Sequence, residues 1–272
     1  MRLSEIKQLL SENNAAALKK YGQNFLIDDH ILSAISASLK NEASSVIEIG
    51  PGLGSLTRFL VADYQKVLAY EIDPKMVKVI QDTIPSVKVI EGDFLKQDVK
   101  TDIKTYFQDI PCIISNLPYY ITTPIIIKIL EELDSIKYFT LMMQKEVAER
   151  IMAKPGNKEY GSLSILLQVY FNITKVIDAP PHAFYPSPDV ASVVLKFIRR
   201  EKPLYDIKNH ESFKQITKLL FSQRRKTIYN NLKGSFDKDQ INSVLESLNL
   251  TPTVRSEDLP IEAIVNICNM LS

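Results

Sequence analysis

The stretch SVIEIGPGLG, residues 45–54, joins an apolar strand-like run to a loop that holds three of the chain's eight glycines. Glycine lets the backbone turn tightly and lets a ligand approach main-chain N–H groups at the start of a helix. Such loops serve nicotinamide, flavin and S-adenosylmethionine sites alike, and some are only structural turns. The stretch therefore predicts a strand, a loop and a helix of an α/β fold, and it leaves the ligand open.

Strand-like and helical runs alternate on both sides of this loop. The strand-like runs are 45–49, 66–70, 87–91, 112–115 and 138–143, and helical patterns occupy 55–64, 74–84 and 122–133. This alternation predicts an open parallel sheet covered by helices on both faces. Two later β-rich runs, 167–179 and 189–200, are expected to extend or close the sheet with antiparallel strands.

Beyond about residue 205 the pattern is helical only, at 209–232, 238–248 and 260–271. The change of period near Lys202-Pro203 predicts a domain boundary there. We therefore expect an α/β domain over residues 1–202 and a small all-helical domain over residues 203–272.

The net charge of the chain is only +1, but the charge is unevenly distributed. Residues 190–235 carry 11 Lys/Arg against 3 Asp/Glu. Such a concentration is typical either of a solvated helical face or of a surface that meets nucleic acid. Charge alone does not separate these two interpretations.

Composition bounds the class of protein. Of the 272 residues, 45% are hydrophobic, which is enough for a core, and the N-terminus lacks the apolar centre of a signal peptide. We expect a cytoplasmic protein with no membrane span. Cys112 and Cys268 lie in apolar runs and are expected to be buried, reduced thiols. Three histidines without the spacing of metal ligands predict no metal site.

Polar groups follow the ends of successive predicted strands. Gly50 follows the first strand, Glu71 the second, Asp93 and Phe94 the third, and Asn116 the fourth. The carboxyl ends of parallel strands meet at one edge of a sheet, where ligand crevices form. Glu71 is suited to accept from a ribose diol in a nicotinamide enzyme as well as in a methyltransferase. Asp93, beside an aromatic ring, is suited to accept from an adenine amine.

Eight motifs occur in order from residue 19 toward the end of the chain. They are KKYGQNFL (19–26), IEIGPGLGSLT (47–57), YEID (70–73), EGDFL (91–95), SNLPYYITTPII (115–126), MQKEVAERI (143–151), AFYPSPDVASVVLKF (183–197) and FSQRRKTIYNNL (221–232). Together they closely resemble the ribosomal RNA adenine N6-dimethyltransferases. The resemblance implies a Rossmann-like, S-adenosylmethionine-dependent catalytic domain over 1–202 and a helical RNA-binding domain over 203–272.

Within that superfamily, Leu117, the PSP segment and RRKTIYNNL resemble the small-subunit enzymes associated with kasugamycin sensitivity. These features imply methylation of two adjacent adenines near the 3′ end of small-subunit (16S) rRNA, with small-subunit (30S) assembly particles as partner and a monomeric enzyme. Two alternatives stay open: a macrolide-resistance-type enzyme of 23S rRNA, which more often has Ile in place of Leu117, and an assembly or transcription factor with secondary methylation. A nicotinamide dehydrogenase would leave the NLPY segment without a chemical role.

The segment SNLPYYITTP, residues 115–124, is an ordinary turn if taken alone. The adenine N6 amine is a poor nucleophile. The resemblance implies that the Asn116 carboxamide and the main-chain carbonyl of Leu117 or Pro118 would accept hydrogen bonds from its two hydrogens. Tyr119 would stack on the target base, and Phe184 would be a second stacking ring.

The resemblance also implies the residues that bind the cofactor and the RNA. Two roles stay open for Glu48: it is either a cofactor contact or a structural cap on the glycine loop. A target adenine must leave its stack, so folded RNA must be held as well, and basic residues supply countercharge. The cofactor contacts are Gln23, Asn24, Leu26, Gly50, Gly52, Glu71, Ile72, Asp93, Phe94 and Asn116. The RNA contacts are Lys19, Lys20, Arg224, Arg225 and Lys226, with Lys196, Arg199 and Arg200 in the same basic segment.

Overall fold

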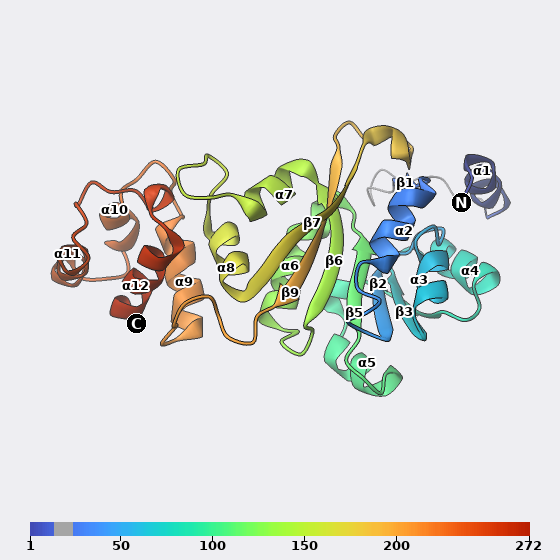
Figure 1. Cartoon of the computed structure of the whole chain (residues 1–272), viewed down its shortest axis with the longest axis horizontal. Helices are drawn as coiled ribbons and strands as arrows, with labels where there is room; N and C mark the ends of the chain where they lie inside the picture. The colour runs from blue at the N-terminus through green and yellow to red at the C-terminus, as the bar shows by residue number, and fades with distance from the viewer. Residues whose placement is uncertain (14–23) are drawn as a thin grey trace. The chain divides into compact units, whose positions relative to one another are not determined.

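The computed structural model describes residues 1–13 and 24–272 (Figure 1). These residues form two compact units. The first unit comprises Met1–Ala148 with Ile173–Arg199, and the second comprises Glu149–Asn172 with Arg200–Ser272. The predicted assignments of Lys19, Lys20 and Gln23 lie outside the described residues.

The described residues of the chain contain a seven-stranded sheet of order β4-β3-β2-β5-β6-β9-β7. Its strands are β2 Ser45–Ile49, β3 Lys66–Glu71, β4 Lys88–Glu91, β5 Cys112–Asn116, β6 Tyr138–Gln144, β7 Phe171–Ala179 and β9 Ser192–Arg199. From β4 to β6 neighbouring strands are parallel, and β9 runs antiparallel to β6. The parallel sheet with an antiparallel extension is confirmed.

The strand-like runs form strands because both faces of the sheet are covered. Every residue of β2 is buried, as expected for a central parallel strand that helices cover on each side. A short ribbon of β1 Phe25–Leu26 and β8 Phe184–Tyr185 lies apart from the main sheet, with Leu26 opposite Phe184. Cys112 and Cys268 are buried free thiols, as predicted.

Three helices of the first unit start at an aspartate side-chain cap. Asp28, Asp73 and Asp98 each accept a hydrogen bond from the first turn of the helix that follows, and Pro74 occupies the first position of α4. The helices described in the first unit are α1 Leu3–Glu12, α2 Asp29–Ala37, α3 Thr57–Asp63, α4 Pro74–Thr83, α5 Val99–Tyr106 and α6 Thr122–Glu131, and α7 Lys145–Met152 runs on into the second unit. Single turns follow three strand ends, at η2 Phe94–Lys96, η3 Tyr119–Ile121 and η4 Pro181–Ala183.

The second unit is helical. It contains α8 Ser162–Tyr170, α9 His210–Leu220, α10 Ile228–Leu232, α11 Lys238–Ser247, η5 Ser256–Asp258 and α12 Ile261–Leu271. Residues 149–172, which the sequence pattern places with the sheet, belong to this unit because α8 packs on α9. Tyr170 contacts Phe213 edge-on, and its hydroxyl lies 2.9 Å from Nδ1 of His210. Residues 167–170, predicted as strand, are the last turn of α8.

One predicted helix, 209–232, is in fact two helices with a loop between them. The Asn231 amide donates to the carbonyl of Leu220 at 2.7 Å, and Ser256 donates to the same carbonyl at 2.7 Å. Thr227 then caps the start of α10. These side chains give the last carbonyl of α9 its hydrogen bonds, so the helix can end there and the chain can turn. The basic run Arg224–Lys226 therefore lies in a loop.

Candidate functional site

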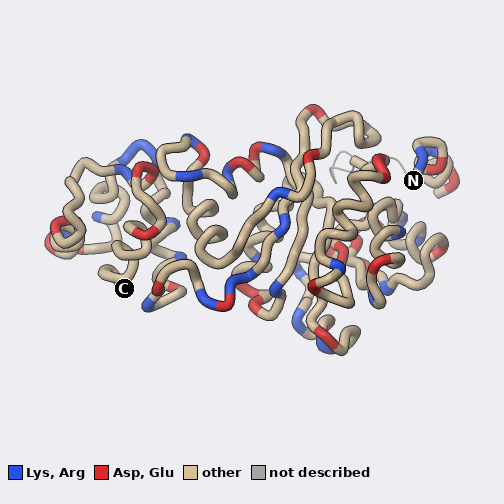
Figure 2. The backbone as a smooth tube through the Cα atoms, in the orientation of Figure 1, with Lys and Arg blue, Asp and Glu red and all other residues tan. Residues whose placement is uncertain are grey.

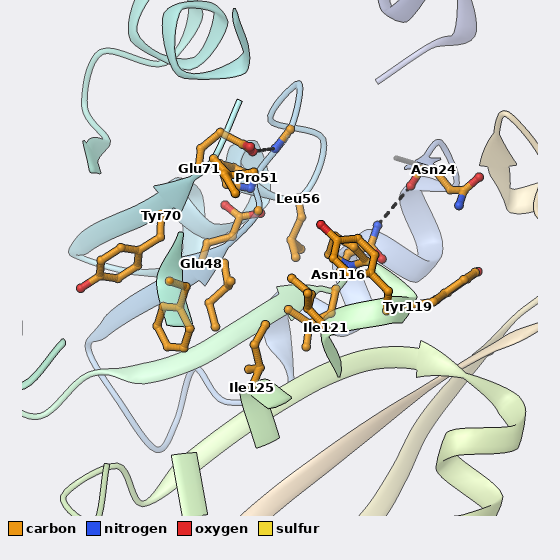
Figure 3. A pocket seen from close by; sticks show the side chains of 18 of the residues that line it. Asn24, Glu48, Pro51, Leu56, Tyr70, Glu71, Asn116, Tyr119, Ile121 and Ile125 are labelled. Carbon is orange, nitrogen blue, oxygen red and sulfur yellow. Dashed lines mark hydrogen bonds between the residues drawn. The ribbon is translucent and has the colours of Figure 1, made fainter. Parts of the chain in front are cut away.

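A cavity of about 200 Å³ opens in the first unit, at the carboxyl ends of β2, β3, β4 and β5 (Figure 3). The structure brings to it all the predicted catalytic and cofactor residues that it describes. These are Asn24, Leu26, Gly50, Gly52, Glu71, Ile72, Asp93, Phe94, Asn116, Leu117, Pro118, Tyr119 and Phe184. Strand order places them together, and their roles stay predictions.

The glycine loop lies against the end of β3. Gly52 has φ +57°, a left-handed conformation that costs a residue with a side chain energy, and a Cβ atom there would lie 3.1 Å from Cε1 of Phe25. The N–H of Gly50 donates to the Tyr70 carbonyl at 2.8 Å, and that of Gly52 donates to Oε2 of Glu71 at 3.0 Å. These two main-chain hydrogen bonds therefore hold the loop against the end of β3.

Glu71 is a buried carboxylate with two main-chain donors. Oε2 accepts from Gly52, and Oε1 accepts from the N–H of Asp73 at 2.9 Å. Burial raises the pKa of Glu71, while these hydrogen bonds oppose the rise. A carboxylate has about four acceptor positions, so Glu71 keeps capacity to accept from a hydroxyl that enters the cavity.

Glu48 lines the same cavity and is 2% exposed. Burial raises the pKa of Glu48 to about 8; the Thr57 hydroxyl opposes the rise and the Glu71 carboxylate adds to it. Its Oε2 has no hydrogen-bond partner within residues 1–13 and 24–272. A buried acceptor without a partner is costly, and a donor from a bound molecule would relieve that cost.

Asp93 and Phe94 form the wall that follows β4. Oδ1 of Asp93 accepts from the N–H of Leu95 at 3.0 Å, which begins the η2 turn. Phe94 is 4% exposed and meets Tyr70 edge-on, with ring centroids 5.2 Å apart. The Tyr70 hydroxyl is in turn held by Asp102 at 2.8 Å. An acceptor and a fixed aromatic ring side by side suit a purine with an exocyclic amine.

Asn116 ends β5 with its carboxamide held in one orientation. Nδ2 donates to the main-chain carbonyl of Asn24 at 3.4 Å, a contact drawn in Figure 3. The side-chain oxygen is thereby left to accept from a ligand. The Pro118 carbonyl already accepts from the N–H of Ile121 at 3.2 Å and from Oγ1 of Thr122 at 3.3 Å. Since an oxygen has two lone pairs, this favours Leu117 over Pro118 as the main-chain acceptor.

Three aromatic rings lie in or beside the NLPY segment, residues 116–119. Tyr119 is half-buried and its hydroxyl lies 2.9 Å from Oγ of Ser192, Phe184 is 4% exposed, and Tyr120 is 56% exposed. Burial raises the pKa of Tyr119, which keeps its phenol protonated. Sequence reasoning missed Tyr120 and Ser192 as neighbours of the site. The doubled tyrosine was a visible signal for the first, but no local pattern marks the second.

The predicted basic contacts divide into engaged and exposed groups. Nζ of Lys196 donates to the Ser38 carbonyl at 2.8 Å and pairs with Glu42, and Arg199 donates to the carbonyls of residues 129, 133 and 136 within and beyond the last turn of α6. These two side chains make contacts within the first unit, and their role as countercharge for RNA stays a prediction. The loop between α9 and α10 carries the run Arg224–Lys226 (Figure 2).

Within the second unit, Arg224 is also tied to protein. Its Nε donates to Oε2 of Glu257 at 2.7 Å, and its Nη2 donates to the Asn157 carbonyl at 3.2 Å. Arg225 and Lys226 are exposed. None of the helices in the described ranges has the length and apolar character needed to cross a membrane. The same ranges hold no group of three or more His, Cys, Asp or Glu arranged to bind a metal ion.

Comparisons with known proteins cover almost the whole chain. A family model described as "Ribosomal RNA adenine dimethylase" matches residues 14–272. A Streptococcus thermophilus protein named "Ribosomal RNA small subunit methyltransferase A" is 40% identical over 279 residues, covering 98% of this chain and 96% of that protein. A Staphylococcus epidermidis protein of the same name is 41% identical, covering 95% and 91%.

Solved structures show the same fold. A dimethyladenosine transferase from Plasmodium falciparum is similar with a TM-score of 0.74 and 27% identity, covering 89% of this chain and 95% of that one. The 23S rRNA methyltransferase ErmE has a TM-score of 0.68 and 24% identity, covering 91% and 99%. The predicted Rossmann-like methyltransferase fold is therefore confirmed.

Proposed function

The chain belongs to the ribosomal RNA adenine dimethylase family, and on that premise we propose that it transfers methyl groups from S-adenosylmethionine to the N6 amines of two adjacent adenines near the 3′ end of small-subunit rRNA. The protein is an rRNA adenine dimethyltransferase. The choice of small-subunit rRNA rests on the relatives at 40% and 41% identity that carry the small-subunit name. The likeness to the 23S enzyme supports the fold alone.

The observation that carries the proposal is the orientation of Asn116. Because its amide nitrogen donates to the Asn24 carbonyl, its oxygen is available as an acceptor in the cavity. The Asn116 oxygen and the Leu117 carbonyl would each accept one N6–H of adenine. Two acceptors placed in this way favour a pyramidal nitrogen, whose lone pair is withdrawn from the ring and free to react.

The base would be held by rings on either side of this segment. Tyr119 and Phe184 both line the cavity. Pro118 directly precedes Tyr119 and restricts the backbone of that turn. The amine becomes strongly acidic once it is alkylated, so its proton can leave without a strong base from the protein. The buried aromatic surface also keeps water away from the reacting nitrogen.

The residues that line the cavity have the chemistry to hold an adenosyl cofactor with an amino-acid end. Glu71 would accept from ribose hydroxyls, and Asp93 with Phe94 would hold the adenine. The unpartnered Oε2 of Glu48 would accept a donor from the amino-acid end, near Asn24 and Leu26. When bound, S-adenosylmethionine supplies an electrophilic methyl group.

The remaining parts of the proposal concern partners and setting. We infer that the helical C-terminal domain, residues 203–272, engages phosphates of a small-subunit assembly particle through Arg225 and Lys226. Arg224 would support that loop through its hydrogen bond to Glu257. The proposed setting is the cytoplasm, and the proposed form is a monomer.

The proposal is tested with separated, unmethylated ribosomal subunits and a labelled methyl donor. We expect label on two adjacent adenines near the 3′ end of the small-subunit rRNA, and dimethylation at both. Short naked RNA should be a poor substrate because the basic loop needs phosphates held in a folded arrangement. Preferential labelling of large-subunit rRNA would contradict the proposed substrate.

A further inference from the structure

The hydroxyl of Tyr119 is tethered to a serine from a distant strand. Tyr119 and Ser192 are 73 positions apart in the chain, and their side-chain oxygens lie 2.9 Å apart. Ser192 is fully buried at the first position of β9. This hydrogen bond belongs to neither the cofactor contacts nor the amine-gripping pair described above.

Strand register explains why this serine reaches the site. Asn116 of β5 lies opposite Met142 of β6, and Ser192 of β9 lies opposite Gln144 of β6. Because β9 runs antiparallel to β6, its first residue lies at the edge of the sheet where β5 and β6 end. Ser192 is thus presented to the turn that follows Asn116.

Tyr119 needs an external anchor because its own turn supplies none. It begins the three-residue turn η3, which contains no buried residue. A tyrosine side chain rotates about two torsions, and its phenolic oxygen lies on the axis of the second. A hydrogen bond at that oxygen therefore restricts the first torsion, which decides where the ring lies. Its neighbour Tyr120 also lines the cavity but is 56% exposed.

We propose that Ser192 is a positioning residue for methyl transfer, and that its hydroxyl holds the Tyr119 ring at the place where it stacks on the target adenine. The inference rests on the proposed function, in which Tyr119 contacts the base. Ser192 touches no substrate and acts through Tyr119. A merely structural serine would affect folding stability and leave the catalytic constants of the folded enzyme unchanged.

The test compares Ser192→Ala, Tyr119→Phe and the double variant on unmethylated small subunits. Each single variant is expected to lower kcat at least about fivefold, and the dissociation constant of S-adenosylmethionine, measured by calorimetry, should stay unchanged. The double variant should be no worse than the less active single variant, because both changes remove one interaction. Full kcat in either single variant, or decreases that multiply in the double variant, would overturn the inference.

Ser36→Ala is the matched control. Ser36 is also fully buried and donates to Oδ2 of Asp63 at 2.6 Å, but it does not line the cavity. It should lower the melting temperature while leaving kcat unchanged. Tyr119→Phe keeps the ring and leaves Ser192 in place, so it tests the tether even if Ser192→Ala fails to fold.

Stacking can be read separately from turnover. With 2-aminopurine in place of one target adenine, the wild-type enzyme should quench its fluorescence, and both single variants should quench it less. Equal quenching by all three proteins would overturn the tether. Failure of the wild type to methylate the adenines would instead contradict the proposed function, so the two failures are distinguishable.

Discussion

The main-chain N–H of Gly52 donates to Oε2 of Glu71 at 3.0 Å, which ties the loop after β2 to the end of β3. The other oxygen of the same carboxylate accepts from Asp73, the capping residue of α4. One buried side chain therefore organises two neighbouring loops at the cavity. Changes at this residue should affect both the ligand and the scaffold.

We expect Glu71→Ala to weaken S-adenosylmethionine binding and to lower stability. A hydrogen bond to a charged group contributes roughly 1.5 to 3 kcal/mol, and the variant loses the proposed ribose contact as well as those to Gly52 and Asp73. Calorimetry measures the affinity, and urea unfolding measures the stability. Glu71→Gln is the control for size. Wild-type affinity in a folded Glu71→Ala protein would remove Glu71 from the cofactor site.

Asn116→Ala should separate chemistry from cofactor binding. The variant loses the acceptor proposed for the target amine, so turnover should fall at least about tenfold. Affinity for S-adenosylmethionine should change little, because Glu71 and Asp93 are untouched. The comparison needs kcat on small subunits beside calorimetry on the same protein. A normal methylation rate would show that the amine is held by other groups.

The pH dependence of the free energy of unfolding should show the ionisation of the Glu48 carboxyl. Burial raises its pKa from 4.5 to about 8, so between those values the folded protein binds one proton more than the unfolded chain. The stability that the protonated Glu48 carboxyl contributes is fully present below the lower pKa. It is lost as pH rises from the lower pKa to the upper one, by about 1.4 kcal/mol per pH unit. Glu48→Gln stays neutral and should lack this fall.

The measurement is urea unfolding of wild type and Glu48→Gln from about pH 5 to about pH 8. The stability advantage of the variant over wild type should grow steadily with pH. Glu71 remains in both proteins, so its own titration largely cancels from the difference. A difference that stays constant over this range would mean that Glu48 ionises at its ordinary pKa.

Gly52→Ala should cost more stability than Gly156→Ala. Both glycines have positive φ, at +57° and +80°, so each substitution carries a left-handed penalty of about 1 to 2 kcal/mol. A Cβ at Gly52 also crowds Phe25 at 3.1 Å, whereas nothing lies within 4 Å of one at Gly156. Thermal unfolding compares the two. Equal costs would show that the Phe25 ring moves freely.

The basic loop should bind RNA through two side chains and be braced by a third. The double variant Arg225→Ala with Lys226→Ala should flatten the slope of log affinity against log salt by about 2 units, one for each phosphate that is no longer neutralised. Arg224→Ala should change the slope less and lower the melting temperature, because it breaks the hydrogen bonds to Glu257 and Asn157. Filter binding to small subunits at several salt concentrations measures this. An unchanged slope in the folded double variant would make the loop a solvated surface.

Sequence patterns predict the order of strands and helices along the chain and most of the residues in the cavity wall. Apolar runs and glycine loops are local signals, and parallel strands bring their carboxyl ends to one edge whatever the details of packing. For that reason Glu71, Asp93 and Asn116 could be expected at one site. The same locality explains why the pattern over 209–232 predicts one unbroken helix, although Asn231 and Ser256 turn the chain after Leu220.

Which residues each side chain contacts depends on the folded chain and could not be predicted from local patterns. Ser192 reaches Tyr119 through the register of β5, β6 and β9, and Lys196 is engaged with Glu42, 154 positions away in the chain. Hydrophobic periodicity tells which face of an element is buried, but not which distant residue lies opposite. Partner identity, the burial that raises the pKa of Glu48, and the pairing of Arg224 with Glu257 all depend on chain segments that meet only after folding.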